Sequence, residues 1–243
     1  MRRLYILILL IGPMLGCSTD MYHHDLTLDE ALDGEEQVAG NVIACAASNE
    51  DDGLVSVFFY QRDGASNVKY YETESADVDK DDFENYYRID LSATDVFNGY
   101  LKKFEVAAFE EKWVIVTFEE AGKVHLSNPI RLKHETRPTE YLPQNVYVDD
   151  GEPGSPVFTW DDGTYTDSEI YFQVVSDAQG NLLSGTYTLE NRFQFYNLDN
   201  VVLNITEQPP SALKSSSAYT FTLLAVSADN WVNLYSEIDF RAK

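Results

Sequence analysis

From about residue 38 onward, the chain is a series of short apolar segments separated by turn-forming residues. Each segment is about seven to eleven residues long and rich in Val, Ile, Phe and Tyr. The breaks carry turn chemistry, as in NEDDG, RDGAS and EEAGK. Residues 113–118 alternate between two faces, with the period of two that is typical of strands. No helix-length amphipathic pattern competes, so the series predicts an all-β fold of antiparallel sandwiches.

The series is interrupted once, at residues 134–144 (HETRPTEYLPQ), which contain two prolines and no strand period. Proline favours extended backbone, so this stretch is predicted to be a semi-rigid linker. We therefore expect two tandem β-sandwich domains, over residues 38–133 and 145–243. The chain of 243 residues has room for two domains of about 100 residues each.

Two features of the second series resemble a fibronectin type III domain. The segment PVFTWDDG is similar to the second strand of that family, with Trp160 as the large core aromatic residue. Leu213 precedes Tyr219 by six residues, which is the family's leucine-to-tyrosine spacing, although LKSSSAY lacks the proline usually found between them. The resemblance implies a fibronectin type III-like or immunoglobulin-like sandwich for residues 145–243. For residues 38–133 it is weaker and rests on WVIVTF and SNPIRL.

Residues 1–16 have the composition of a secretory signal peptide. Two arginines precede an apolar run that is shorter than the roughly 20 residues of a membrane-spanning helix. Gly16 and Cys17 at its end resemble the lipobox of bacterial lipoproteins, although Met14 stands where that family most often has leucine. The resemblance implies cleavage before Cys17 and acylation of its thiol. The alternative is a plain signal peptide that is cut elsewhere, with no role for Cys17.

A lipoprotein with this sequence is expected in the outer membrane of a Gram-negative bacterium. Several acyl chains together give stable membrane anchoring, whereas one chain alone is marginal. Ser18 stands where the family's inner-membrane retention signal has aspartate. Residues 17–37 are rich in acids and poor in core-forming residues, which predicts a disordered acidic tether. Within that tether, Thr27 and Glu30 have the spacing of a helix capping box, which would allow one short helical turn.

The strong acidity of the chain limits its partners. The formal net charge is −24, which argues against nucleic acid because phosphate contacts require clustered Lys and Arg. It also disfavours adsorption to an anionic lipid surface. If Cys17 is acylated, Cys45 is the one remaining cysteine and no intramolecular disulfide is possible. Cys45 lies in the apolar run NVIACAA, where a free cysteine usually behaves as a small buried hydrophobe.

Arrangements that would support catalysis or metal binding are weak in this sequence. Asp77, Asp79 and Asp81 match the first, third and fifth positions of an EF-hand-like loop, and they are weak calcium candidates. That loop needs glycine where Asp82 stands and a bidentate acid where Arg88 stands, so a solvated acidic loop is the alternative. No zinc-type spacing, nucleophile elbow or phosphate-binding loop is found. We therefore predict a protein that is not an enzyme and needs no cofactor.

Aromatic side chains are the remaining resource for binding, with 16 Tyr, 13 Phe and 3 Trp in the chain. The doublets Tyr70–Tyr71 and Tyr86–Tyr87, if they lie in strands, place one ring on each face. The outward rings, of which Tyr71 and Tyr87 are the candidates, either cover an exposed sheet or form a binding face. Trp231 is expected in a loop at one end of the second sandwich, which makes it the leading candidate contact residue.

These features together predict a membrane-anchored, non-catalytic binding or scaffold module of the cell envelope. Its sandwich surfaces would be presented to a protein partner. A glycan-binding accessory lipoprotein is the alternative, since outward aromatic rings stack on sugars. A hydrolase is a third hypothesis with less support, because abundant carboxylates include close pairs by chance.

Overall fold

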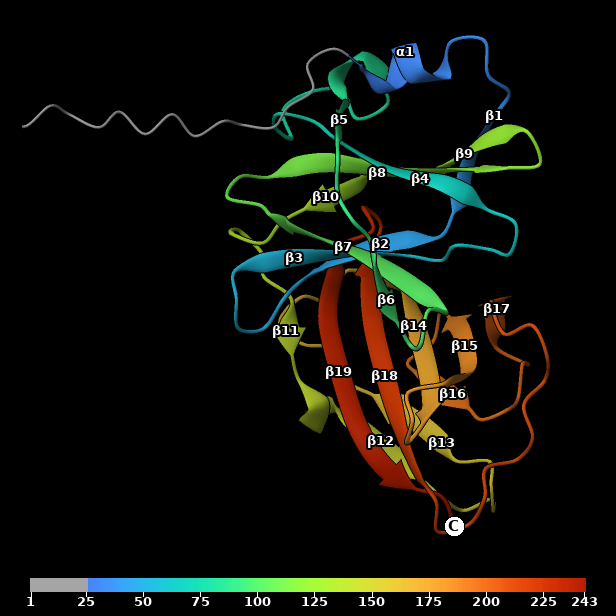
Figure 1. Cartoon of the computed structure of the whole chain (residues 1–243). Coiled ribbons are helices and arrows are strands. Elements are labelled where there is room, and N and C mark those ends of the chain that lie inside the picture. The colour runs from blue at the N-terminus through green and yellow to red at the C-terminus, as the bar shows by residue number, and fades with distance from the viewer. Residues whose placement is uncertain (1–25) are drawn as a thin grey trace, which may run out of the picture.

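The computed structural model describes residues 26–243, and these residues confirm the predicted all-β class with two antiparallel sandwiches. Domain 1 comprises strands β1 to β10 with helix α1, and domain 2 comprises strands β11 to β19 (Figure 1). Cys17 lies outside the described residues. Within residues 26–243, no helix is long and apolar enough to cross a membrane.

Domain 1 is built from two sheets. Its elements are α1 (Leu28–Leu32), β1 (Gln37–Val42), β2 (Ala44–Ser48), β3 (Leu54–Phe59), β4 (Ser66–Glu72), η1 (Phe83–Asn85), β5 (Tyr87–Ile89), β6 (Thr94–Val96), β7 (Leu101–Ala107), β8 (Lys112–Glu120), β9 (Lys123–Ser127) and β10 (Ile130–Leu132). One sheet has the strand order β1-β9-β8-β4-β5, with β10 paired to β8, and the other has the order β2-β3-β7-β6.

Domain 2 is built in the same way from a large and a small sheet. Its elements are β11 (Glu140–Tyr141), η2 (Pro143–Asn145), β12 (Val146–Asp149), β13 (Val157–Trp160), β14 (Ser168–Asp177), β15 (Leu182–Thr188), β16 (Arg192–Gln194), β17 (Val201–Asn204), β18 (Ala218–Ser227) and β19 (Val232–Arg241). The large sheet has the order β11-β19-β18-β14-β15-β17, and the small sheet has the order β12-β13-β16.

Both domains begin with the same topological device. The first strand of each, β1 or β11, pairs in parallel with a late strand of one sheet, β9 or β19. The next strand, β2 or β12, pairs antiparallel with β3 or β13 in the opposite sheet. A single stretch of chain therefore contributes to both sheets at the edge of each sandwich. The two domains thus share this arrangement of their first strands, whereas β6 extends the small sheet of domain 1 and β17 extends the large sheet of domain 2.

The core of domain 2 contains the residues on which its resemblance to a fibronectin type III domain rests. Trp160, Leu213 and Tyr219 are all buried between the two sheets. The Lys214 backbone N–H donates a hydrogen bond of 2.9 Å to the Tyr219 hydroxyl oxygen. A tyrosine that ties the preceding loop to its own strand in this way is the corner found in many sandwich domains. The corner therefore forms even though the loop contains no proline.

Helix α1 begins with the predicted capping box. The Thr27 hydroxyl accepts from the Glu30 N–H at 3.3 Å, and the Glu30 carboxylate accepts from the Thr27 N–H at 3.0 Å. Leu28 and Leu32, one turn apart, are buried against the outer face of the β4–β8 sheet. The prediction of a disordered tether is therefore wrong for residues 26–37, because two leucines in this acidic stretch find an apolar surface.

Candidate functional site

Trp231, the leading candidate contact residue, is not on the surface. It lies at the tip of the β18–β19 hairpin, which projects out of domain 2, and its side chain is fully buried in the core of domain 1. The indole Nε1 donates to the Arg137 carbonyl at 2.8 Å, and the Trp231 backbone forms a parallel bridge with Ala46. The prediction that Trp231 contacts a partner is wrong, because the hairpin end is covered by the neighbouring domain.

The two tyrosine candidates differ in exposure. Tyr71 is buried, since α1 and its leucines cover the outer face of the sheet on which its ring lies. Tyr71 is therefore wrong as a contact residue, and burial against α1 raises the pKa of its hydroxyl. Tyr87 is half-buried in the edge strand β5, and its backbone bridges Thr27. Neither ring contributes to a broad exposed aromatic face.

The weak calcium candidates do not converge on one point. The Asp79 carboxylate accepts from the Asp81 backbone N–H at 3.0 Å, which makes it part of a turn. The Asp81 carboxylate forms an ion pair with Lys80 at 2.7 Å. Within the described chain, no group of three or more His, Cys, Asp or Glu side chains is placed to hold a metal ion. Asp77, Asp79 and Asp81 therefore belong to an acidic loop and are not assembled into a site.

Arg62, Glu120 and His125 form a cluster of ionisable side chains in domain 1. Arg62 forms an ion pair of 2.7 Å with Glu120, and its guanidinium lies 5.0 Å from the centre of the Phe118 ring. His125 contacts the same carboxylate at 3.6 Å and the Asn41 side-chain oxygen at 2.6 Å. The hydrogen bond from Arg62 lowers the pKa of Glu120. A carboxylate held ionised by arginine is unsuited to donate a proton, so this cluster does not resemble a general acid.

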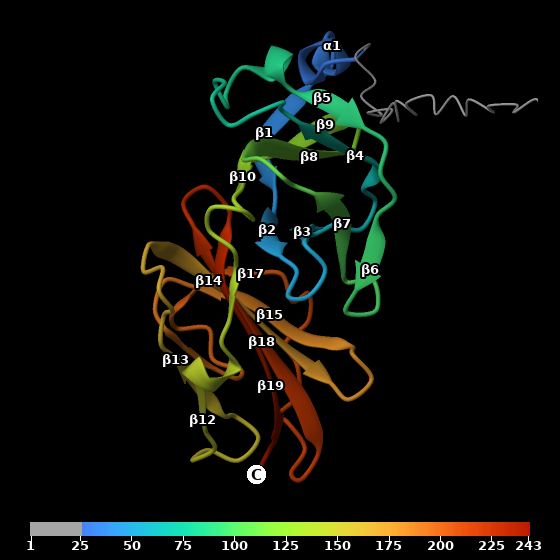
Figure 2. The ribbon, with the colours of Figure 1, turned by 90° about the vertical axis from the view of Figure 1, so that its left-hand side faces the viewer.

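The two domains are packed directly against each other. The outer face of the β2–β3–β7 sheet lies across the upper ends of β14, β18 and β19 (Figures 1 and 2). A hydrophobic cluster fills the space between them. Its buried members include Ala47 and Leu101 of domain 1 and Phe172, Val174, Leu224 and Val226 of domain 2. Burial of this apolar surface holds the two domains in one arrangement.

Residues 134–144, predicted as a semi-rigid linker, form a buried part of this junction. The Ser48 N–H donates to the Thr139 hydroxyl at 2.9 Å, and the Thr139 hydroxyl donates to the Val232 carbonyl at 2.8 Å. The Tyr141 hydroxyl donates to the Ser48 carbonyl at 2.8 Å. These hydrogen bonds join the segment to both domains, so the segment helps to hold the domains together.

An exposed apolar surface lies on domain 2, at the free edge of the large sheet. Strand β17 pairs with β15 and ends the strand order of the described sheet, so its other side presents backbone N–H and C=O groups. Four large apolar side chains lie on and beside this strand. They are Leu189 (60% exposed), Leu198 (43%), Val202 (54%) and Leu203 (41%). We call these four residues, together with strand β17, the β17 edge.

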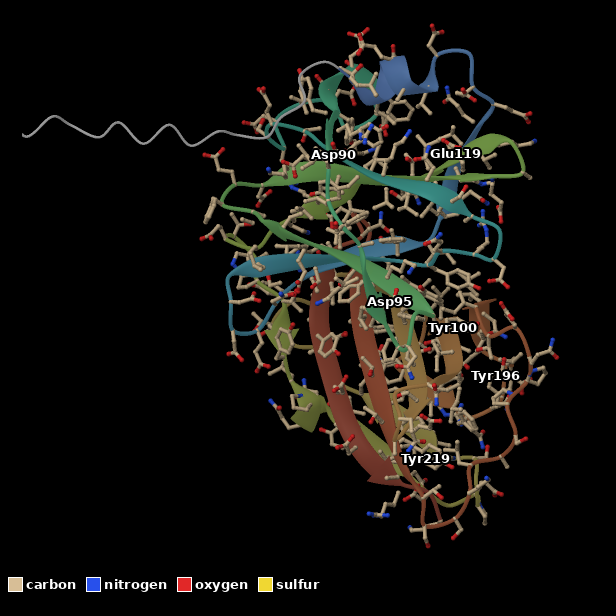
Figure 3. The ribbon with its side chains drawn as sticks, viewed as in Figure 1. Asp90, Asp95, Tyr100, Glu119, Tyr196 and Tyr219 are labelled. Atoms are coloured by element: carbon tan, nitrogen blue, oxygen red, sulfur yellow. The ribbon has the colours of Figure 1, made fainter. Side chains whose placement is uncertain are left out.

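The β17 edge is held in place by contacts within domain 2. The Ile205 N–H donates to the Gly185 carbonyl at 3.0 Å, and the Asn204 side chain donates to the Tyr196 hydroxyl at 2.7 Å. Tyr196 lies on the same side of domain 2, whereas Tyr100 lies at the junction with domain 1 (Figure 3). Three exposed acids flank the edge in the sequence. They are Glu190, Asp199 and Glu207.

The sequence contained a signal for this surface that the strand pattern alone did not reveal. Val201, Val202 and Leu203 are consecutive, and successive side chains of a strand point to opposite faces. At least one of them must therefore face away from the core. Which face is open depends on the position of β17 at the edge of the sheet, and this is a property of the topology.

No protein-family model matches the chain, and no curated protein matches it. Among solved structures, it is similar to the chicken CNTN1 FN1-FN3 domains, with 12% identity over 86% of this chain and a TM-score of 0.29. It spans 65% of the length of that chain. A two fibronectin type III domain segment from chicken tenascin shows 12% identity over 84% of this chain and 97% of that one, with a TM-score of 0.30.

By its own strand order, the chain is a protein of tandem antiparallel β-sandwich domains. The fold class rests on this topology and on the buried residues of the two cores.

Proposed function

We propose that this protein is a lipid-anchored, non-catalytic binding module of the bacterial cell envelope that presents the β17 edge to a protein partner. The observation that carries the proposal is the coincidence of a free strand edge with four exposed apolar side chains. An extended peptide adds to such an edge through main-chain hydrogen bonds, and alternate side chains provide specificity. Native proteins normally blunt or cover edges of this kind, so an open apolar edge marks an interaction site.

The charge around the β17 edge favours a basic segment of the partner. Glu190, Asp199 and Glu207 are exposed beside it, and the chain as a whole carries a net charge of −24. Opposite charge accelerates association and excludes acidic competitors, although rim charges add little to affinity. We therefore propose an extended, positively charged peptide segment as the occupant of the edge.

The first described element and the proposed edge belong to different domains, and β17 lies close to the junction between them (Figure 1). Helix α1, the first described element, packs on the side of domain 1 that faces away from domain 2 (Figure 1). An acylated Cys17 would attach this end of domain 1 to the outer membrane. Because domain 2 packs on the opposite side of domain 1 from α1, domain 2 would then lie farther from the lipid surface, with the β17 edge on its flank (Figure 1).

Glycan binding is the alternative predicted from the sequence, and it depended on exposed aromatic rings. Trp231 and Tyr71 are buried, so neither ring is available to stack on a sugar. The exposed large aromatic side chains of the described chain are Phe109 and Tyr147, which belong to different domains. No observation favours a glycan over a protein at the β17 edge.

Crosslinking in intact cells tests the β17 edge. A photo-crosslinking amino acid at Leu198 is expected to give one major adduct with another protein, through a peptide of net positive charge identified by mass spectrometry. The additional substitution Val202→Lys places a like charge in the path of that basic segment, and the adduct is expected to decrease at least about tenfold. Val202 is more than half exposed, so the fold tolerates this change.

Phe109 provides the matched control, because its side chain is 80% exposed and lies on domain 1. The substitution Phe109→Lys is expected to leave the Leu198 adduct unchanged. An adduct insensitive to Val202→Lys would contradict the proposal. Adducts formed only between copies of this chain would identify the occupant as a second copy and would contradict it equally.

The anchor is tested separately by the substitution Cys17→Ser. The unaltered protein is expected to fractionate with outer membranes and to carry an acylated cysteine at its mature N-terminus. The Cys17→Ser protein is expected to be released into the soluble fraction, because serine lacks the thiol to which the lipid is attached. An unmodified Cys17, or a cleavage site elsewhere in the intact protein's mass spectrum, would contradict the lipoprotein proposal.

A further inference from the structure

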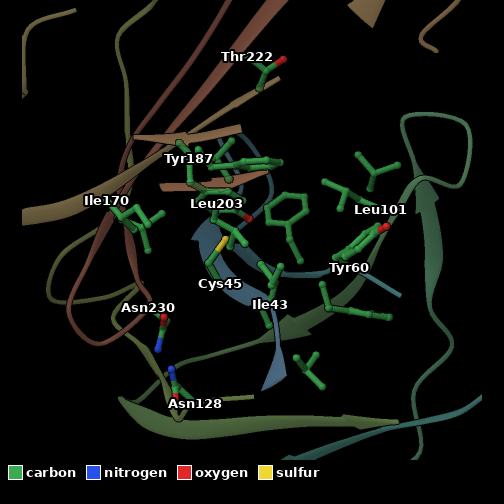
Figure 4. A pocket seen from close by; sticks show the side chains of 18 of the residues that line it. Ile43, Cys45, Tyr60, Leu101, Asn128, Ile170, Tyr187, Leu203, Thr222 and Asn230 are labelled. Carbon is green, nitrogen blue, oxygen red and sulfur yellow. The ribbon is translucent and has the colours of Figure 1, made fainter. Parts of the chain in front are cut away.

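A cavity of about 280 Å³ lies between the two domains, beside the hydrophobic cluster that joins them. Strands β2 and β3 and the turn after β6 line it from domain 1. Strands β14, β15, β17 and β18 line it from domain 2. Cys45, Tyr187 and Leu203 gather on one wall, with Ile43 and Tyr60 nearby (Figure 4). Small-molecule sites occur preferentially at domain interfaces of this kind.

The chemistry of the walls is apolar and uncharged. Most lining side chains are aliphatic or aromatic, and no Asp, Glu, Lys, Arg or His of residues 26–243 lines the cavity. A charged ligand would be taken out of water without a counterion, which is strongly unfavourable. The walls therefore select an uncharged ligand.

One polar group on the wall lacks a partner. Tyr187 is 9% exposed, and its ring stacks on Phe172 at a centroid distance of 4.4 Å. Within the described chain, the Tyr187 hydroxyl makes no hydrogen bond, and burial raises its pKa well above the ordinary value. The hydroxyl oxygen itself is not fully enclosed, so its O–H is open to donate a hydrogen bond to a molecule in the cavity. A ligand with one hydrogen-bonding atom would satisfy it.

We propose that this cavity binds an uncharged, largely apolar small molecule that carries a single hydrogen-bonding group, with the Tyr187 hydroxyl as its polar contact. A cavity of about 150 Å³ binds benzene, so the larger volume suits a ligand of about twelve non-hydrogen atoms. Leu203 both lines the cavity and is 41% exposed, so the cavity reaches the surface at strand β17. This site shares Leu203 with the β17 edge, but its ligand is a small molecule and its binding does not depend on a protein partner.

Cys45 supplies an internal reporter of occupancy. Its side chain lines the cavity, and burial raises the pKa of its thiol to about 12. Alkylation requires the thiolate, so Cys45 is expected to react slowly near neutral pH. A ligand in the cavity would slow the reaction further by blocking access to the sulfur atom.

The experiment uses the full chain with Cys17→Ser, in which Cys45 is the sole thiol, and three probes of similar size. The probes are 2-naphthol, naphthalene and 2-naphthoate, and binding is measured by titration calorimetry at neutral pH. We expect 2-naphthol to bind about fivefold more tightly than naphthalene, because one neutral hydrogen bond contributes modestly. The anionic 2-naphthoate is expected to bind at least about tenfold more weakly than 2-naphthol. The variant Tyr187→Phe keeps the stacked ring and is expected to abolish the preference for 2-naphthol over naphthalene.

Cys45 alkylation by N-ethylmaleimide gives the second readout. Saturating 2-naphthol is expected to slow it at least about fivefold. In a chain carrying Cys17→Ser, Cys45→Ser and Phe109→Cys, the exposed thiol at position 109 is expected to react equally fast with and without 2-naphthol. Absence of saturable binding by 2-naphthol would overturn the proposal. So would equal binding of 2-naphthoate, or a preference for 2-naphthol that persists in Tyr187→Phe.

Discussion

Replacement of Trp231 by alanine is expected to lower the free energy of unfolding by about 3–5 kcal/mol, the usual range for deleting a large buried aromatic side chain. Trp231 is carried by the chain of domain 2, yet its indole ring is fully buried in the core of domain 1. The substitution therefore leaves a cavity in the domain to which the residue does not belong. It also removes the indole donor of the 2.8 Å hydrogen bond to the Arg137 carbonyl.

The same substitution is expected to separate the unfolding of the two domains. The hairpin that carries Trp231 also makes backbone hydrogen bonds to domain 1, from the Ala46 N–H to the Asn230 carbonyl at 3.0 Å and from the Arg131 N–H to the Asp229 carbonyl at 2.9 Å. With the indole in place, we expect one cooperative transition in urea. In Trp231→Ala, domain 1 is expected to unfold at lower urea concentration than domain 2, because it loses the larger share of its packing.

Urea denaturation followed by hydrogen exchange and mass spectrometry distinguishes the two domains, since peptides from β8 and β18 report on each separately. Phe109→Ala is the matched control, because this side chain is 80% exposed, and its effect is expected to stay within about 0.5 kcal/mol. If Trp231→Ala lowered the free energy of unfolding by less than about 1 kcal/mol, the insertion of the hairpin into the core of domain 1 would be contradicted. A loss of hydrogen-exchange protection confined to domain 2 would contradict it as well.

The features that were predicted correctly from the sequence all depend on local periodicity or fixed spacing. Alternation of apolar residues predicted the all-β class, because a strand with one buried face repeats every two residues. The capping box of Thr27 and Glu30 and the spacing of the two core residues Leu213 and Tyr219 each involve residues only a few positions apart. Such signals lie within a short stretch of sequence, so they can be recognised without knowledge of the tertiary structure.

The features that were missed depend on which surfaces meet. Tyr71 faces outward from its sheet as expected, but its cover comes from Leu28 and Leu32, which lie in a segment predicted to be disordered. Trp231 has the position of an end-loop residue, but the end of its sandwich is buried by domain 1. No residue spacing encodes such contacts, because the partners are separated by tens of residues or more. The β17 edge shows the opposite case. Its apolar residues stay exposed because the strand lies at the end of its sheet and no other element of the described chain covers it.

A comparably large loss is expected from Lys112→Met, which breaks a buried ion pair in domain 1. The Lys112 ammonium lies 2.8 Å from the Glu72 carboxylate, and the two side chains are only 11% and 9% exposed. The second carboxylate oxygen of Glu72 accepts from the Tyr70 hydroxyl at 2.9 Å. Removal of the ammonium takes the counterion at 2.8 Å away from a buried carboxylate, which typically costs about 3–5 kcal/mol.

The origin of that loss is tested by removing the second charge as well. In the double variant Glu72→Gln with Lys112→Met, the amide still accepts from Tyr70 and carries no charge, so about 2 kcal/mol of the loss is expected to be recovered. The exposed pair of Lys102 and Asp95, with 30% and 63% exposed side chains, is the matched control. Lys102→Met is expected to cost less than about 1 kcal/mol in the same urea titration, because water screens an exposed pair. If the double variant were no more stable than Lys112→Met alone, the loss would come from packing of the lysine side chain, and a buried uncompensated charge would be the wrong explanation.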